Sequence, residues 1–352
     1  MNRKMYQIVE LSETLMHAGS KATSDVTKIL SQMGVESLEI MTVSGSKNPI
    51  KKATRQLSYL NQWKRVCRKI EKESILFLQN PFYRNQLGRF TQLSNLKKNK
   101  NIKVISIVHD VSELRGSFDS KYFEIEFSQM LELADVLIVH NENMKKWFIE
   151  YGVSEDRLFV LEIFDYLTDK PLAVASSLEK VVTVAGNLSK EKSPYVYKLH
   201  QLPDLDVNLY GINYEKEIIS DNISYKGAFP SDQVPYELNA GFGLVWDGDS
   251  LDTCSGPTGN YLKFNNPHKL SLYLSSGIPV IVWKESAEAT FVLENKIGFV
   301  VASLSDIDGI FNSLTLEDYI EYQNNAKNIG CQLHDGYYTK KVVREILTSL
   351  NK

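Results

Sequence analysis

Apolar and polar positions fall into alternating blocks along the chain. Short apolar runs, rich in β-branched residues, are separated by longer stretches in which apolar residues recur at helical spacing. Apolar runs without internal polar alternation are typical of parallel strands buried on both faces. In the first half we expect strands at Tyr6–Val9, Leu38–Met41, Ile75–Leu78, Lys103–Val108, Val136–Val139 and Leu158–Glu162. Helical stretches are expected at Ser20–Met33, Ala53–Glu73, Tyr83–Lys98 and Lys121–Leu133.

A polar segment, Asp165–Glu179, interrupts this alternation and predicts a linker. The pattern then restarts. The strands expected in the second half are Lys180–Ala185, Val207–Tyr210, Ile223–Lys226, Phe242–Trp246, Pro279–Val282 and Gly298–Val301. The helices expected there are one from Ser193, then Lys269–Ser276, Ala287–Asn295, Leu316–Ile329 and Lys340–Leu350.

Alternation of strands and helices in both halves predicts two doubly wound, Rossmann-like α/β domains. A length of 352 residues suits two domains at about 150 residues each. We place the domains at 1–167 and 168–335, with a final helix, 336–352, that can return to the first domain. In such sheets ligands bind outside the carboxyl ends of the strands, which predicts a site in a cleft between the domains.

Composition narrows the class of protein. With 43% hydrophobic residues and a net charge of -3, the chain is globular, and nucleic acid is not expected as its main partner. Three scattered cysteines, Cys67, Cys254 and Cys331, fit neither a metal site nor a disulfide framework and indicate a reducing, cytoplasmic location. The basic segment 46–72 is interpreted either as a solvated helix face or as a peripheral contact with the inner face of a membrane.

The densest group of candidate residues follows the Phe242–Trp246 strand and ends at the start of the next helix. Asn266 can cap that helix, and Pro267 is tolerated in its first turn. Free N–H groups at a helix start suit a pyrophosphate. His268 and Lys269 in this first turn are disfavoured by the helix dipole unless an anion binds there. The alternative is an ordinary capped helix whose His and Lys face water.

Other residues at strand ends suit a phosphate-bearing ligand in the cleft. Gly186, Asn187 and Lys190 follow the first strand of the second half, where a small residue admits a ligand and a lysine can reach a phosphate. Tyr210 can stack on a base, although a core tyrosine is the alternative. Asp247 can bind ribose or belong to a polar loop. Its spacing to Asp249 is not that of a metal motif, so no metal is inferred.

Strand ends in the first half suggest the acceptor side. Either Asp110 or His109 can take the proton of an attacking hydroxyl, while Asp110 can instead cap the following turn. The residues expected near the acceptor are His17, Gly19, Ser20, Lys21 and Gln79. The motifs of dinucleotide-binding dehydrogenases, P-loop enzymes and serine hydrolases are all absent from the sequence.

The stretch GFGLVWDGDSLDTCSGPTGNYLKFNNPHKLSLYLSSGIPVIVW, residues 241–283, resembles the galactofuranosyltransferases of bacterial polysaccharide assembly. More distantly, the chain resembles the glucosyltransferases that extend N-acetylglucosamine on streptococcal serine-rich adhesins. The supporting pieces are Ala18–Ala22, Phe77–Pro81, Val108–Val111, Val139–Asn141 and Ala185–Leu188.

The resemblance implies a GT-B fold, a uridine-diphosphate sugar as donor in the second domain, and no required metal or further cofactor. It implies that the residues facing the donor are Gly186, Asn187, Lys190, Tyr210, Trp246, Asn266, Pro267, His268 and Lys269, with Lys269 and His268 on the leaving diphosphate. The longer loop from Asp247 to Tyr261 favours galactofuranose as the transferred sugar. The acceptor would be a glycan, glycolipid or glycoprotein, and a homo-oligomer is compatible with this interpretation.

Three alternative functions are compared with this interpretation. The chain can be a glucosyltransferase using UDP-glucose on an adhesin glycan, or a non-catalytic GT-B subunit that binds glycans. Retention of Asn266, His268 and Lys269 argues against the second. A sugar-nucleotide epimerase would need a nicotinamide fingerprint, which the sequence lacks.

Overall fold

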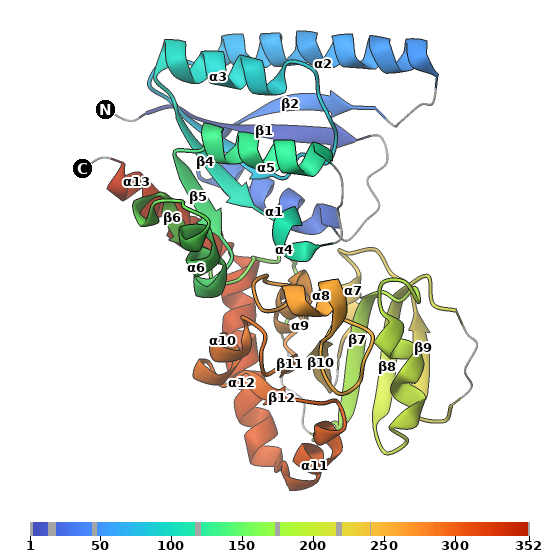
Figure 1. The fold of residues 1–352 in the computed structure, drawn as a ribbon. Helices are drawn as coiled ribbons and strands as arrows, with labels where there is room; N and C mark the ends of the chain where they lie inside the picture. Colours follow the sequence, from blue (N-terminus) through green and yellow to red (C-terminus); the bar gives the residue numbers. More distant parts are fainter. Residues whose placement is uncertain are drawn as a thin grey trace.

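The computed structural model describes residues 3–12, 19–43, 48–116, 121–172, 177–215, 220–239 and 241–350. Figure 1 shows two α/β domains, one above the other, each built on a single sheet. Each sheet has six strands, and all the strand pairs described are parallel. The prediction of two doubly wound Rossmann-like domains is therefore confirmed.

The first domain carries the sheet in the order β2-β1-β3-β4-β5-β6. Its strands are β1 Met5–Ser12, β2 Glu36–Thr42, β3 Ile75–Asn80, β4 Lys103–Val108, β5 Val136–Val139 and β6 Leu158–Val160. Its helices are α1 Gly19–Gln32, α2 Pro49–Lys69, α3 Arg89–Lys100, α4 Ser112–Arg115, α5 Lys121–Leu133, α6 Glu142–Glu150 and the 3-10 helix η1 Glu155–Arg157. The helices α2 and α3 cover one face of this sheet (Figure 1).

The second domain carries the sheet in the order β12-β11-β10-β7-β8-β9. Its strands are β7 Val181–Asn187, β8 Asp206–Ile212, β9 Ile223–Gly227, β10 Phe242–Val245, β11 Val280–Trp283 and β12 Gly298–Val301. Its helices are the 3-10 helix η2 Pro194–Gln201, then α7 Val234–Glu237, α8 Gly256–Tyr261, α9 His268–Ser275, α10 Ala289–Glu294, α11 Asp306–Ser313 and α12 Leu316–His334. The last helix of the chain is α13 Tyr337–Ser349.

Central strands are buried on both faces, as their continuous apolar sequence predicts. All four residues of β5, β10 and β11 are buried. Burial of a Val, Leu or Ile side chain contributes roughly 1.5–3 kcal/mol to folding, so these strands anchor the two cores. The sheets in turn hold the loops at their carboxyl ends in fixed positions.

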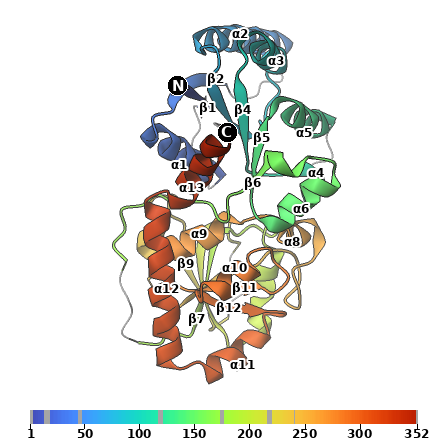
Figure 2. The ribbon, with the colours of Figure 1, turned by 90° about the vertical axis from the view of Figure 1, so that its left-hand side faces the viewer.

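The final helix crosses back to the first domain. In Figure 2, α13 lies beside α1 and β6, while α12 runs along the second domain. Gly336, between α12 and α13, has φ of +69°, and a β-carbon there would lie 2.6 Å from the side chain of Ile29 on α1. A glycine is therefore needed where the chain turns against α1.

Several helices differ from the sequence expectation, and α4, α6, α7 and α11 were not expected at all. The expected helix Tyr83–Lys98 begins only at Arg89, because Gly88 precedes it in the left-handed conformation. The helix expected from Ser193 is a 3-10 helix. The loop after β10 contains the short helix α8, which was not expected because the sequence of this loop is polar. Among the described residues, no helix is long and apolar enough to cross a membrane.

Candidate functional site

The candidate site lies where the carboxyl ends of the two sheets approach each other. Helix α4, which follows β4, packs against α8, which follows β10 (Figure 1). The phenol oxygen of Tyr261 on α8 accepts a hydrogen bond from the backbone N–H of Val111, 3.0 Å away in the first domain. The loop that follows β10 therefore contacts the loop that follows β4.

Lys269 occupies the first turn of α9 and turns toward the end of β10. Its Nζ donates to Asp247 Oδ1 at 2.9 Å and to the Trp246 carbonyl at 3.2 Å. Burial alone would lower the pKa of this ammonium, but Asp247 and the Tyr273 hydroxyl outweigh burial and raise the pKa above its ordinary value. The lysine is therefore a cation at neutral pH, with about a fifth of its side chain exposed.

Gly186 lies directly against Lys269. A β-carbon on Gly186 would lie 3.6 Å from Lys269 Cε, and the residue has φ of +142°. On the next strand, a β-carbon on Gly211 would lie only 1.8 Å from the Gly186 carbonyl oxygen. Because neither glycine has a side chain, the ends of β7 and β8 can approach each other beside the lysine. Such glycines are expected where a ligand approaches the backbone.

Four other residues predicted for the donor lie around this edge in different environments. The Asn187 side chain is exposed and accepts hydrogen bonds from Ser189 N and Asn213 Nδ2. Lys190 is exposed and pairs with Glu215 at 3.4 Å. Tyr210 is half-buried near Phe229. The indole of Trp246 is fully buried in the core of the second domain, so only its carbonyl is available at this edge.

Asn266 links the two domains. Its Nδ2 donates to the carbonyls of His140 and Glu162, and its Oδ1 accepts from Asn141. Its backbone N–H donates to His140 Nδ1 at 2.9 Å. The expectation that Asn266 caps α9 is wrong, because Pro267 occupies the N-cap position and no side chain caps that helix. The side-chain amide of Asn266 therefore forms hydrogen bonds across the junction between the domains and does not cap the helix.

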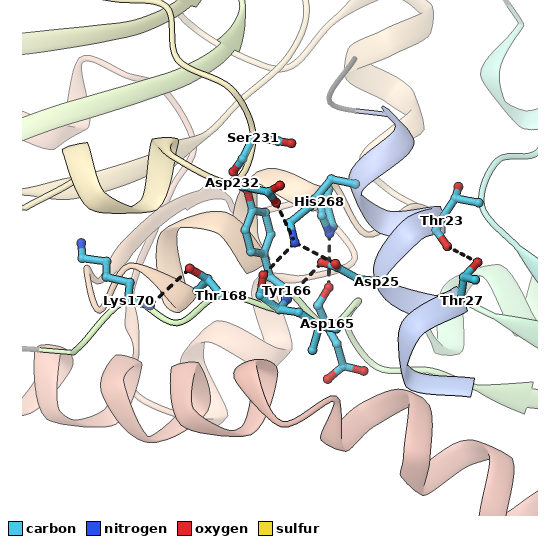
Figure 3. Close-up of polar contacts among 12 residues, drawn as sticks. Thr23, Asp25, Thr27, Asp165, Tyr166, Thr168, Lys170, Ser231, Asp232 and His268 are labelled. Atoms are coloured by element: carbon cyan, nitrogen blue, oxygen red, sulfur yellow. Dashed lines mark hydrogen bonds and ion pairs between the residues drawn. The ribbon is translucent and has the colours of Figure 1, made fainter. Parts of the chain in front are cut away.

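His268, the first residue of α9, stacks on Tyr166 with ring centroids 4.9 Å apart. Its Nε2 lies 3.3 Å from the Asp165 carbonyl (Figure 3). Burial lowers the pKa of this imidazole to about 4. His268 is therefore neutral at neutral pH, and its one N–H is directed to the Asp165 carbonyl, so the expected contact of His268 with a diphosphate is not favoured and the positive charge at this edge comes from Lys269.

Lys21, which the sequence suggested for the acceptor, is buried instead between α1, the linker and the second domain. Its Nζ lies 2.7 Å from Asp25 Oδ1 and 2.7 Å from the Leu167 carbonyl. It also lies 3.3 Å from Asp232 in the second domain. All these contacts are between protein groups, which gives Lys21 a role in holding the domains together. A role toward the acceptor stays a prediction.

Gln79 and His109 form a fixed pair at the ends of β3 and β4. Gln79 Nε2 donates to the Thr23 carbonyl and to Thr27 Oγ1, which turns Gln79 Oε1 toward His109 Nε2 at 2.7 Å. His109 Nε2 therefore carries the proton. The ring also stacks on Phe164. Burial, followed by His140 and His268, lowers the pKa of His109 to about 3, which makes it a weak base.

Asp110 forms an ion pair with Arg115 through Oδ2. Its Oδ1 is buried and has no hydrogen-bond partner among the described residues. A carboxylate oxygen without a partner is costly to bury, and a hydroxyl that reached it would supply the missing hydrogen bond. The Tyr261 hydroxyl, whose pKa is raised by burial and by Asp110, also interacts with this carboxylate. Of the two predicted bases, Asp110 therefore has the more suitable geometry.

The remaining acceptor predictions cannot be judged from the structure. His17 lies outside the described residues, and for Gly19 and Ser20 only the backbone is described, at the start of α1. Among the described residues, no group of three or more His, Cys, Asp or Glu side chains is arranged to hold a metal ion.

Two tyrosines that sequence reasoning missed help to build the site. The Tyr273 hydroxyl accepts from the Ala185 N–H at 2.9 Å, next to Gly186. A β-carbon on Gly243 would lie 2.1 Å from the Tyr273 ring, so that glycine makes room for it. Tyr261 makes the interdomain contact with Val111. The four-residue spacing of Tyr273 from Lys269 on one helix was the only signal for the former.

Both domains match the models of one family. Residues 5–163 match the N-terminal domain of the glucosyltransferase 3-like family, and residues 182–346 match its C-terminal domain. The chain is 33% identical to a β-1,6-galactofuranosyltransferase of Escherichia coli, over 98% of this chain and 99% of that protein. The chain belongs to the glucosyltransferase 3-like family. It is therefore a glycosyltransferase, as the sequence resemblance predicted.

Other relatives fit this assignment. Glucosyltransferase 3 of Streptococcus gordonii is 27% identical over 92% of both chains. Among solved structures, a glycosyltransferase of Rickettsia africae matches with a TM-score of 0.65 at 15% identity, covering all of both chains. Anabaena HepE in complex with UDP-glucose matches with a TM-score of 0.62 at 12% identity, covering 98% of this chain and 100% of that one. At this identity the structural matches show a shared GT-B fold.

Proposed function

We propose that this glycosyltransferase moves a galactofuranosyl residue from UDP-galactofuranose to a sugar hydroxyl of a polysaccharide or glycolipid precursor. The observation that carries the proposal is the Lys269 ammonium beside Gly186, at the carboxyl edge of the second sheet. A cation next to a glycine near a strand end suits the diphosphate of a nucleotide sugar. The Escherichia coli relative named for galactofuranosyl transfer, aligned over nearly the whole chain, supports the choice of sugar.

In the proposed reaction, the acceptor oxygen attacks the anomeric carbon, and the bond from that carbon to the diphosphate oxygen breaks. The acceptor proton passes to Asp110 Oδ1, and UDP leaves with the bonding electrons. Lys269 stabilises the negative charge that develops on the diphosphate. The donor therefore needs no metal ion in this proposal, and turnover should persist in excess EDTA.

The test is UDP release from a panel of UDP-sugars that includes UDP-galactofuranose, UDP-galactopyranose, UDP-glucose and UDP-N-acetylglucosamine. Preferred turnover of the furanose supports the proposal. Preferred turnover of UDP-glucose would favour the alternative, a glucosyltransferase, which the relation to streptococcal glucosyltransferase 3 supports. Binding of none of these donors would favour a non-catalytic subunit that recognises glycans.

A second part of the proposal concerns location. Helix α2 contains seven Lys or Arg and no Asp or Glu among its 21 residues. Its outward face also exposes Ile50, which is 74% exposed, and Leu57, which is 56% exposed. Cationic side chains with exposed apolar residues between them are the composition of helices that lie on anionic lipid surfaces. We propose that α2 rests on such a surface, where a glycolipid acceptor would be found.

Sedimentation with lipid vesicles tests this contact. The protein should bind vesicles containing 30% phosphatidylglycerol, and binding should weaken in high salt because surface charges are screened. The triple variant Lys64→Glu, Arg65→Glu, Arg68→Glu should lose binding. Its matched control changes three exposed lysines of the second domain, Lys192, Lys226 and Lys284, to Glu, and should still bind. Equal binding to neutral and anionic vesicles would contradict the proposal.

A further inference from the structure

An exposed aromatic ring stands beside the candidate base. Tyr83 follows β3 by three residues and is 56% exposed. Asp110 follows β4 by two residues, and the two strands pair in register, with Asn80 opposite Val108. The His109 N–H also donates to the Asn80 carbonyl at 2.7 Å. The chain therefore leaves both strands at the same point of the sheet edge, which brings Tyr83 close to Asp110.

The Tyr83 ring is braced by other aromatic rings. Phe123 on α5 meets it edge to face, with centroids 6.3 Å apart and planes 74° apart. Tyr122 packs against Phe123 with centroids 5.3 Å apart. The Tyr122 hydroxyl in turn donates to the Phe82 carbonyl at 2.6 Å. The exposed ring thus packs on Phe123 of α5, and the hydrogen bond from Tyr122 ties that helix to the loop that carries Tyr83.

The surroundings of the ring are charged. Partial burial, followed by the charge of Asp110, raises the pKa of Tyr83 to about 12, and Arg115 opposes that shift. The hydroxyl therefore stays protonated at neutral pH. Asp110 and Arg115 pair with each other, while Asp110 Oδ1 keeps no partner among the described residues. One small region offers an apolar ring face, a hydroxyl and a carboxylate oxygen.

A sugar ring has complementary chemistry. Its axial C–H groups form an apolar, weakly positive face that packs on the negative face of an aromatic ring. Its hydroxyls require hydrogen-bond partners when they leave water. Exposure alone does not distinguish Tyr83, since Tyr151 is 53% exposed; its position beside Asp110 at the sheet edge does.

We propose that Tyr83, braced by Phe123, is the platform on which the acceptor saccharide stacks, with the reacting hydroxyl directed to Asp110. This inference rests on the proposed function, since it assigns the acceptor side of the same site. It names the acceptor group as a sugar ring presented by its C–H face, rather than a serine or threonine hydroxyl of a protein.

The experiment compares Tyr83→Ala with Tyr151→Ala. Tyr151 is a matched control, because it is 53% exposed, belongs to the first domain and also meets a phenylalanine, Phe127, edge to face. Transfer is measured with a panel of methyl and octyl glycosides of glucose, galactose and N-acetylglucosamine as acceptors. Tyr83→Ala should raise the acceptor KM at least tenfold and leave the KM for the donor within twofold. Tyr83→Phe should retain an acceptor KM near that of the wild type, and Tyr151→Ala should change neither.

Saturation-transfer NMR with the same glycosides, in the absence of any nucleotide, separates this inference from the proposed function. Glycoside signals that are present with the wild type and lost in Tyr83→Ala would support the platform even if UDP-galactofuranose is not the donor. An unchanged acceptor KM in Tyr83→Ala would overturn it, as would the absence of binding by every glycoside to the wild type.

Discussion

Lys269 Nζ lies 2.9 Å from Asp247 Oδ1, so the lysine from the first turn of α9 is paired with the carboxylate that follows β10. Both side chains are about a fifth to a quarter exposed. A diphosphate arriving at this edge can replace the single carboxylate as partner of the ammonium, because it carries more negative charge. The ion pair thus keeps the cation in place until the donor binds.

Replacing Lys269 with Ala should reduce kcat by about 10²–10³, the usual effect of removing one group that stabilises developing negative charge. Steady-state kinetics with the preferred UDP-sugar measures this. Lys263→Ala is the matched control, because Lys263 precedes the same helix but pairs with exposed Glu285. Near-normal turnover in Lys269→Ala, with the fold intact, would remove the lysine from the mechanism.

Lys21 forms ion pairs with Asp25 and with Asp232, and we expect the two pairs to contribute very differently to the free energy of unfolding. Lys21 and Asp25 are both almost fully buried, so Lys21→Met would leave Asp25 as a buried charge whose remaining hydrogen-bond partner, among the described residues, is the Leu167 N–H. We expect a loss of about 3–5 kcal/mol in the free energy of unfolding. Asp232, with three quarters of its side chain exposed, should contribute less than about 1 kcal/mol, which Asp232→Asn tests.

Urea unfolding of both variants, followed by circular dichroism, gives the comparison. Equal losses in the two variants would show that the interdomain pair with Asp232, rather than the buried pair with Asp25, carries the stability.

The buried imidazole of His140 predicts a dependence of stability on pH. His140 donates from Nε2 to the Val108 carbonyl and accepts at Nδ1 from the Asn266 N–H, so both nitrogens are occupied in the neutral form. Burial lowers its pKa from 6.5 to about 4. The unfolded chain therefore binds a proton before the folded one does. The contribution of His140 is fully present above pH 6.5 and is lost as the pH falls toward 4.

In His140→Gln the share of the pH dependence that comes from His140 should disappear, while the shares of His109 and His268, whose pKa values are also lowered by burial, remain. Between pH 7 and pH 5 the variant should lose about 2 kcal/mol less stability than the wild type. Comparing the two proteins is essential because Asp165, whose burial raises its pKa to about 6, acts in the opposite direction. Identical pH profiles of the urea midpoint would contradict the assignment.

The strand pattern and the donor edge could be predicted from the sequence because both are local. Each apolar run became a strand, and Gly186 and Lys269 lie at strand and helix ends, where doubly wound sheets bind ligands. The Asn266 cap was predicted wrongly because its true partners are distant. His140 and Glu162 are 126 and 104 residues away in sequence, and no local pattern reveals such contacts.

The environment of Trp246 and Lys21 depends on packing in the same way. A tryptophan that ends a strand can face a ligand or the core, and only the packing of β10 against its neighbours decides that the indole is buried. Lys21 follows a glycine and a serine that suggest an open loop, yet the linker and the second domain close over it. The burial of a polar side chain is a property of the folded chain.

The most direct test of the account is the ratio of kcat/KM for UDP-galactofuranose to kcat/KM for UDP-glucose, measured with wild-type protein and one glycoside acceptor. We predict a ratio well above ten, together with a loss of at least a hundredfold for both donors in Lys269→Ala. A ratio below one would contradict the galactofuranosyl assignment and make the chain a glucosyltransferase, while activity independent of Lys269 would contradict the site itself.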